Sequence, residues 1–192
     1  ERTMSLPRET DYGTPRRESE QLVTLCIDGI DITVPAGTSV MRAAQEAGTA
    51  IPKLCATDSL EPWGSCRLCT VEIEGRRGYP ASCTTTCTEG MVVHTQLTSP
   101  VAEKAQRGMN EFLLANHPLD CPVCDRGGEC ELQDLAMGFG RDVSRYAERK
   151  RVFKDQNLGP LVSTDMTRCI HCTRCERLGK EIAGAPALGT MR

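Results

Sequence analysis

Apolar and polar residues alternate near the start of the chain in the pattern of a β-hairpin. Residues 23–27 (VTLCI) place an apolar side chain at every second position, and residues 30–34 (IDITV) repeat this alternation. Asp28-Gly29 between them suits a tight two-residue turn. The pattern therefore predicts two antiparallel strands joined by that turn.

A short helix is predicted to follow the hairpin. Residues 40–47 (VMRAAQEA) bring small and apolar side chains to one helical face. Thr38 or Ser39 is the expected N-cap, because a hydroxyl oxygen can accept a hydrogen bond from the first turn. Gly48 is expected to end the helix.

Two further strands complete this unit. They are expected at residues 70–74 (TVEIE) and around residues 91–95. A hairpin followed by a crossing helix is typical of a β-grasp fold, in which helix and sheet share one core. Residues 21–97 are therefore predicted to form an α+β domain.

A small helical domain is predicted over residues 98–140. Ser99-Pro100 is a strong helix start, because proline suits the first turn. Residues at helical spacing follow it: Val101, Ala105, Met109, Phe112, Leu113 and Asn116. Pro118 should end this helix at His117, because the residue before a proline avoids helical geometry.

The rest of the chain is predicted to contain one more helix in that domain, a linker and a final segment. The helix is expected over residues 129–137 and should end at Gly138. Residues 141–158 are charged and rich in turn formers, so they are predicted to be a linker. Residues 159–192 are expected to form a tight loop running into a helix.

Residues 1–20 (ERTMSLPRETDYGTPRRESE) mix charges of both signs with proline and glycine. They contain no apolar run, so neither a signal peptide nor a membrane anchor is expected there. We predict that this segment is disordered and exclude it from the fold.

Composition points to metal cofactors. Twelve of the 192 residues are cysteines, about 6%, which is below the roughly 8–10% of a disulfide-built secreted scaffold. Small domains with few apolar residues commonly need metal staples. The net charge is −3 and the basic residues are scattered, so a nucleic acid partner is not expected. Without a long apolar stretch, any link to a membrane should run through partner proteins.

The first candidate metal set has the spacing C-x10-C-x2-C-x13-C. A long loop with one distant fourth thiolate can enclose a 2Fe-2S cluster, as in the related plant-type ferredoxin spacing. Gly64-Ser65 leaves the backbone free to turn its N–H groups toward sulfur. A four-cysteine zinc site is the alternative, although zinc sites usually use two close cysteine pairs. The predicted 2Fe-2S ligands are Cys55, Cys66, Cys69 and Cys83.

The second set has the spacing H-x3-C-x2-C-x5-C. Three thiolates can hold three corners of a 4Fe-4S cluster, and a fourth donor is needed. The imidazole at the end of the preceding helix is the local candidate. The alternative is that this histidine only places a cation at the helix C-terminus, and spacing alone leaves both interpretations open. The predicted ligands are His117, Cys121, Cys124 and Cys130.

The third set is a C-x2-C-x2-C run formed by Cys169, Cys172 and Cys175. Overlapping pairs of this kind wrap one 4Fe-4S cluster in bacterial ferredoxins. The position of the usual fourth cysteine holds Gly179, so the third cluster is incompletely ligated by these residues. His171 lies between two ligands and is expected to point away from them.

The remaining cysteines and motifs add no further site. Cys26 lies on the strand face opposite the apolar residues, and Cys87 lacks the third cysteine that a C-x3-C-x2-C loop needs. Both are predicted to be non-ligands. No complete G-x-G-x-x-G or P-loop is present, so neither nicotinamide nor flavin binding is expected here. No catalytic residue is predicted.

The order of the three sets carries a resemblance to a known family. The first spacing, then HPLDCPVCDRGGECELQDLA, then NLGPLVSTDMTRCIHCTRC resemble the N-terminal part of the large iron–sulfur subunit of NADH-quinone oxidoreductase, respiratory complex I. The resemblance covers nearly everything from Leu22 onward. It implies a β-grasp 2Fe-2S domain, a helical 4Fe-4S domain with one histidine and three cysteine ligands, and a ferredoxin-like 4Fe-4S domain.

The resemblance also implies roles and partners. It makes His117 a ligand and places the fourth ligand of the third cluster beyond the present sequence, which we expect to be part of a longer protein. It implies a flavin-bearing, NADH-binding partner and other subunits of the hydrophilic arm of a proton-translocating complex. The expected location is cytoplasmic, peripheral to the cell membrane through that complex.

Two rival interpretations stay open. PKLCATDSLEPWGSCRLC and PASCTT resemble the α subunits of soluble NAD-linked formate dehydrogenases, and an NAD-reducing hydrogenase subunit would use the same clusters. A zinc-stapled interaction module is the alternative from another class.

Overall fold

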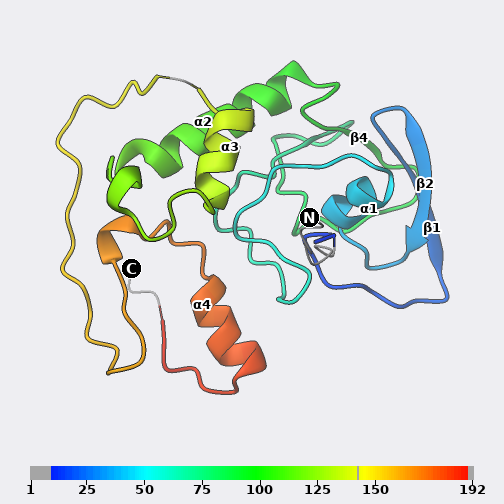
Figure 1. Cartoon of the computed structure of the whole chain (residues 1–192). Helices are drawn as coiled ribbons and strands as arrows, with labels where there is room; N and C mark the ends of the chain where they lie inside the picture. Colours follow the sequence, from blue (N-terminus) through cyan, green and yellow to red (C-terminus); the bar gives the residue numbers. More distant parts are fainter. Residues whose placement is uncertain (1–9, 142, 190–192) are drawn as a thin grey trace, which may run out of the picture.

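The computed structural model describes residues 10–141 and 143–189. A four-stranded mixed sheet lies on one side of the molecule (Figure 1), with the strand order β2-β1-β4-β3. β1 runs antiparallel to β2 and parallel to β4, and β3 is antiparallel to β4. The strands are β1 (Leu22–Ile27), β2 (Ile30–Pro35), β3 (Glu72–Ile73) and β4 (Val92–His94).

The predicted hairpin and its helix are confirmed. Ile27 pairs with Ile30 across the turn, and Asp28 and Gly29 have φ of 50° and 83°, as a tight hairpin turn requires. Helix α1 (Val40–Glu46) is capped by Ser39, whose hydroxyl accepts from the Arg42 backbone N–H. The two later strands form where expected but are shorter than the pattern suggested.

The core of this unit lies between the sheet and α1. Its side chains come from the inward face of β1 and from one face of the helix, and full burial of each large aliphatic chain contributes about 1.5–3 kcal/mol. The innermost members are Ile27, Val34, Val40, Ala43, Ala44, Val71 and Val93. The α+β fold class is therefore confirmed.

Helix α2 (Pro100–Ala115) begins as predicted but buries an unexpected face. Ser99 caps it by accepting from the Ala102 backbone N–H. The fully buried stripe is Ala102, Gln106 and Asn110, whereas Phe112 is 74% exposed. The apolar spacing therefore identified the helix but not its most buried side.

The buried amides of α2 are held by backbone carbonyls. Gln106 donates to the carbonyl of Thr70 at 2.9 Å, and Asn110 donates to that of Leu135 at 2.9 Å. Burial of a polar group is tolerated when it is hydrogen-bonded; the amide nitrogens meet this condition, whereas the amide oxygens of Gln106 and Asn110 have no partner in the described part of the chain. These two amides attach α2 to the sheet domain on one side and to the next helix on the other.

Two helix ends differ from the prediction. α2 ends at Ala115, two residues before His117, and Asn116 is its C-cap. The next helix, α3 (Glu131–Phe139), begins and ends two residues later than expected. Gly138 lies inside α3, and a Cβ added there would meet nothing within 4 Å. The helix continues past it, because a glycine is tolerated within a helix at a modest cost.

The C-terminal part contains short helical turns separated by loops. Residues 143–165, which include most of the predicted linker, contain no helix or strand. Figure 1 shows them as a long arc around the outside of the molecule. The short elements are η1 (Cys121–Val123), η2 (Met166–Arg168), α4 (Arg174–Arg177) and η3 (Leu178–Ile182). In the described residues, no helix has the length and apolar character that a membrane crossing needs.

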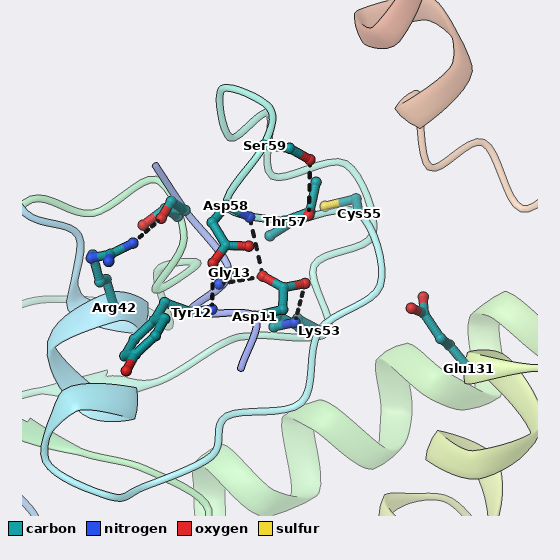
Figure 2. Close-up of polar contacts among 12 residues, drawn as sticks. Asp11, Tyr12, Gly13, Arg42, Lys53, Cys55, Thr57, Asp58, Ser59 and Glu131 are labelled. Carbon is teal, nitrogen blue, oxygen red and sulfur yellow. Dashed lines mark hydrogen bonds and ion pairs between the residues drawn. The ribbon is translucent and has the colours of Figure 1, made fainter. Parts of the chain in front are cut away.

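The prediction of a disordered N-terminal segment is wrong for residues 11–14. Figure 2 shows Asp11 between Lys53 and the backbone of Asp58. Its carboxylate accepts from the Lys53 ammonium at 2.8 Å and from the Asp58 backbone N–H at 3.1 Å. Charge patterning could not reveal these long-range partners. Residues 1–9 lie outside the described part of the chain.

This N-terminal strap, residues 11–14, also contacts α1. The Arg42 guanidinium lies 4.7 Å from the centre of the Tyr12 ring, a cation–π distance, and donates to the Thr14 carbonyl at 2.6 Å. Hydrogen bonds with Asp58 and Lys53 hold the pKa of Asp11 well below its usual range, although burial opposes them. The strap therefore fastens the loop that carries Cys55 to the rest of the domain.

Replacement of Asp11 by alanine should loosen this strap. The change leaves two backbone N–H groups and Lys53 without their acceptor, so we expect a loss of about 1–2 kcal/mol in the free energy of unfolding. Urea denaturation followed by circular dichroism measures it. Glu18→Ala, at an exposed neighbouring position, is the control, and equal stabilities of the two variants would contradict the role of the strap.

Candidate metal centres

The four cysteines of the first set are buried together. Their exposures are between 0% and 6%. The Cys55 sulfur contacts those of Cys66 and Cys83, and Cys83 contacts Cys69 in turn. Within residues 10–141 and 143–189, no three His, Cys, Asp or Glu side chains are grouped to hold one metal ion. The sulfurs are joined through these pairwise contacts instead.

Local backbone geometry explains how a long loop brings these thiols together. Gly64 and Arg67 have φ of 69° and 57°, left-handed values that turn the chain sharply on either side of Cys66. The Ser82 N–H donates to the Cys69 carbonyl at 2.9 Å. This bond brings the segment of Cys83 against the loop.

Hydrogen bonds among the thiols shift their pKa values. Hydrogen bonds from Cys66 and Cys83 lower the pKa of Cys55, whereas the hydrogen bond to Cys55 raises that of Cys83. A hydrogen bond from Cys83 lowers the pKa of Cys69 to about 7 against the effect of burial. The lowered pKa values of Cys55 and Cys69 favour the thiolate, the form that ligates metals, whereas hydrogen bonds to Cys55 raise the pKa values of Cys66 and Cys83.

The donor set fits an iron–sulfur group. Four thiolates are soft ligands, and the buried Ser82 hydroxyl has no partner of ordinary hydrogen-bond geometry although it lies close enough to Cys69 to lower the pKa of that thiol. A hydroxyl in this position can donate to sulfur.

All four residues of the second set line one cavity of about 120 Å³. His117 follows the end of α2, Cys121 lies in η1, Cys124 follows η1, and Cys130 is the N-cap of α3. The structure therefore brings together the three thiols and the imidazole that the spacing selected. In the described part of the chain they are not close enough together to form a metal-binding group, so their joint ligation of one cofactor stays a prediction.

The alternative role for His117, a cation at the helix end, is performed by another residue. The Lys150 ammonium donates to the carbonyls of Leu114 and His117 at 2.9 and 2.6 Å, where the helix dipole favours a positive charge. Burial, with Lys150 and Arg168 nearby, lowers the pKa of His117. This shift favours the neutral imidazole, the form that binds metals.

Sequence reasoning missed both Lys150 and Arg168. Arg168 lines the second cavity and pairs with Asp165 at 3.0 Å and with Asp120 at 3.6 Å. Both cations lie more than thirty residues from the histidine in sequence. Lys150 lies in the basic stretch ERKRVFK, and Arg168 directly precedes Cys169 of the third set, but neither position indicated a contact with the second site.

The third set is less enclosed. Cys169 and Cys175 are exposed and Cys172 is half-buried. His171 and Thr173 flank Cys172 with φ of 53° and 62°, so the backbone reverses on both sides of it. Cys169 and His171 line a cavity of about 230 Å³ together with His117. The predicted bystander role of His171 stays a prediction.

One apolar cluster touches all three sets. Leu54, Leu68 and Leu132 are buried in it with Cys55 and Cys66 of the first set. Cys130 of the second set and Cys172 of the third pack against it. We call this group the central cluster. Ligand candidates from three separate segments of sequence thus share one apolar neighbourhood.

Cys87 and Cys26 are the two cysteines predicted to be non-ligands. Cys87 belongs to the core around β1 and α1, which also contains Cys69 and Cys83 of the first set. Burial raises the pKa of Cys87 to about 12, so it remains a thiol. Cys26 is half-buried on β1.

Comparison with known proteins supports three iron–sulfur segments. Residues 20–98 match a 2Fe-2S iron–sulfur cluster binding domain. Residues 106–145 match the NADH-ubiquinone oxidoreductase-G iron–sulfur binding region, and residues 159–192 match the ferredoxin-like domain of NADH-quinone oxidoreductase subunit 3. The NADH-quinone oxidoreductase G subunit of Streptomyces coelicolor is 55% identical over 170 residues, 88% of this chain and 20% of that protein. This chain belongs to the family of the large iron–sulfur subunit of NADH-quinone oxidoreductase.

A mitochondrial relative shows a similar level of identity. The mitochondrial NADH dehydrogenase iron–sulfur protein 1 of Solanum tuberosum is 48% identical over 97% of this chain and 25% of its own length. The chain thus spans a fifth to a quarter of the length of these relatives.

A solved structure is also similar to this chain. A chain of an NAD+-reducing [NiFe]-hydrogenase has a TM-score of 0.80 and 33% identity, and the match covers 88% of this chain and 71% of that one.

These findings confirm the predicted 2Fe-2S and 4Fe-4S domains. The individual ligands, the domain boundaries, the number of clusters and the histidine ligation stay predictions.

Gly127→Ala should disturb the second site alone. A Cβ at this position would lie 2.7 Å from the Cys121 carbonyl oxygen and 3.1 Å from that of Cys124, so the backbone between these cysteines must move. We expect lower iron content and a weaker 4Fe-4S signal, with the 2Fe-2S signal unchanged. Iron analysis and EPR of the reduced protein measure this.

The matched control is Gly138→Ala. An added Cβ there meets nothing within 4 Å, and alanine favours the helix. Equal iron content in both variants would show that the turn at Gly127 does not shape the site.

Proposed function

We propose that this chain is the electron-relay region of a large iron–sulfur subunit in an NADH:quinone oxidoreductase of the complex I type. It would carry single electrons from an NADH-oxidising flavin partner toward quinone. The observation that supports this most is the central cluster, which adjoins candidate ligands of all three sets. Cofactors ligated there would be near neighbours in an apolar medium.

The proposed ligation uses eleven residues. One 2Fe-2S group would be held by Cys55, Cys66, Cys69 and Cys83, and one 4Fe-4S group by His117, Cys121, Cys124 and Cys130. A second 4Fe-4S group would be held by Cys169, Cys172 and Cys175 with a further donor. When bound, such groups accept and give up single electrons, and the protein supplies ligation, spacing and tuning.

The side chains around each set determine how readily it is reduced. A neutral imidazole in place of a thiolate lowers the negative charge at the second site, which favours reduction. Arg168 on the same cavity is paired with Asp120 and Asp165, so its positive charge is largely offset. Leu54, Leu68 and Leu132 provide an apolar neighbourhood for candidate ligands of each set.

The partners follow from the same proposal. NADH oxidation would belong to a flavin-bearing subunit, because this sequence has no complete dinucleotide motif. Relatives are named as subunits of NADH-quinone oxidoreductase, so we infer contacts with other subunits of a hydrophilic arm. The chain would then lie on the cytoplasmic side, peripheral to the membrane through that complex.

A second candidate function is supported by the hydrogenase likeness. In that case the same region would link a hydrogen- or formate-oxidising module to NAD+ reduction. Purification of the intact native complex separates the two functions. Quinone-dependent NADH oxidation supports the first, whereas NAD+ reduction driven by hydrogen or formate supports the second.

Anaerobic reconstitution of the chain with iron and sulfide tests the cofactor assignment. We expect a brown protein that, after reduction, gives a 2Fe-2S EPR signal and at least one 4Fe-4S signal. A colourless protein that retains zinc and gives no signal would instead support the zinc-stapled module.

His117→Ala tests the proposed ligand. We expect the 4Fe-4S signal of the second site to change its g-values or to disappear, while the 2Fe-2S signal persists. His94→Ala is the matched control, because it removes an imidazole from β4 that lines neither of the cavities beside His117. Identical spectra of the two variants would make His117 a non-ligand.

A further inference from the structure

The guanidinium of Arg177 is buried among backbone carbonyls of two candidate ligands. Arg177 is the last residue of α4 and is 5% exposed. It donates to the carbonyls of Cys55 and of Cys172, the latter at 3.4 Å. Further donors reach the Glu61 carbonyl at 2.8 Å and the Thr173 hydroxyl at 3.2 Å. One side chain therefore holds segments more than a hundred residues apart.

These bonds join the first site to the third. Cys55 belongs to the first set and Cys172 to the third. A second link runs the same way, because the Ser65 hydroxyl donates to the Cys172 carbonyl at 3.2 Å. The planar guanidinium fork can serve several acceptors at once, which a lysine ammonium cannot do with the same rigidity.

The charge of Arg177 has no carboxylate opposite it. All its partners are neutral oxygens, and no ion pair of Arg177 occurs among residues 10–141 and 143–189. By contrast, Arg174 on the same helix pairs with Glu131 at 2.6 Å. A buried cation is costly unless an opposite charge compensates for it. A negatively charged iron–sulfur group held by Cys55 would supply that compensation.

We propose that Arg177 is a positioning residue that ties the ligand loops of the first and third sites together and favours the reduced state of the first. This inference rests on the proposed electron relay. Reduction adds one electron, and therefore one negative charge, to the group that Cys55 helps to hold. A fixed positive charge beside the Cys55 backbone stabilises that extra charge. The midpoint potential of the 2Fe-2S group is therefore higher with the guanidinium in place.

A redox titration of the reconstituted chain, followed by the 2Fe-2S EPR signal, tests this role. Arg177→Gln removes the charge, and its midpoint potential should fall below that of the parent chain. Arg177→Lys keeps the charge and should stay near the parent value. Lys180→Gln, which removes a charge from an exposed position three residues later, should match the parent and serves as the control.

The outcomes are distinguishable. A parent chain without a 2Fe-2S signal contradicts the proposed function itself. A parent with the signal, but with equal potentials in Arg177→Gln and Lys180→Gln, overturns the role of Arg177 alone. If Arg177→Gln assembles no 2Fe-2S group, Arg177→Lys decides. If Arg177→Lys assembles the 2Fe-2S group at the parent potential, the proposed role of the positive charge is supported. A lowered potential, or a failure of Arg177→Lys to assemble the group, overturns that role.

Discussion

Packing around the apolar central cluster is the constraint on which the arrangement of the three candidate sites depends. Leu54, Leu68 and Leu132 bring three sequence segments to one place. Burial of a negatively charged thiolate costs free energy. Backbone N–H groups that donate to sulfur, and cationic side chains nearby, can offset this cost. The sharp turns at Gly64 and Arg67 and the buried Arg177 are consequences of the need to offset it.

The segments are joined mainly by side chains that donate to backbone carbonyls. Gln106 and Asn110 attach α2 in this way, and Lys150 holds the end of the same helix. Arg177 does so between the first and third sites. Backbone carbonyls that are not used in a sheet or helix are available acceptors wherever the chain is irregular. A chain with few strands and long loops can therefore be held together without a large apolar core.

Much of the fold and of the candidate sites could be predicted from local sequence, because their signals are local. Alternation of apolar and polar residues predicted the hairpin, and capping residues predicted the starts of α1 and α2. The spacing of cysteines and His117 predicted the three sets of donors. The four members of the second set line one cavity, as their closeness in sequence suggested. Partners that lie far apart could not be predicted. The attachment of Asp11 to Lys53, and of Arg177 to Cys55, depends on tertiary packing that no spacing records.

The same distinction explains why His117 could not be interpreted from spacing alone. A histidine before a proline at a helix end suits both a ligand and a helix-capping cation. The choice depends on whether another cation occupies the helix end. Lys150, in the segment predicted to be a linker, places its ammonium at this helix end. Its charge also disfavours protonation of the His117 imidazole. An apparently structureless segment thereby favours the neutral, metal-binding form of a residue thirty-three positions away.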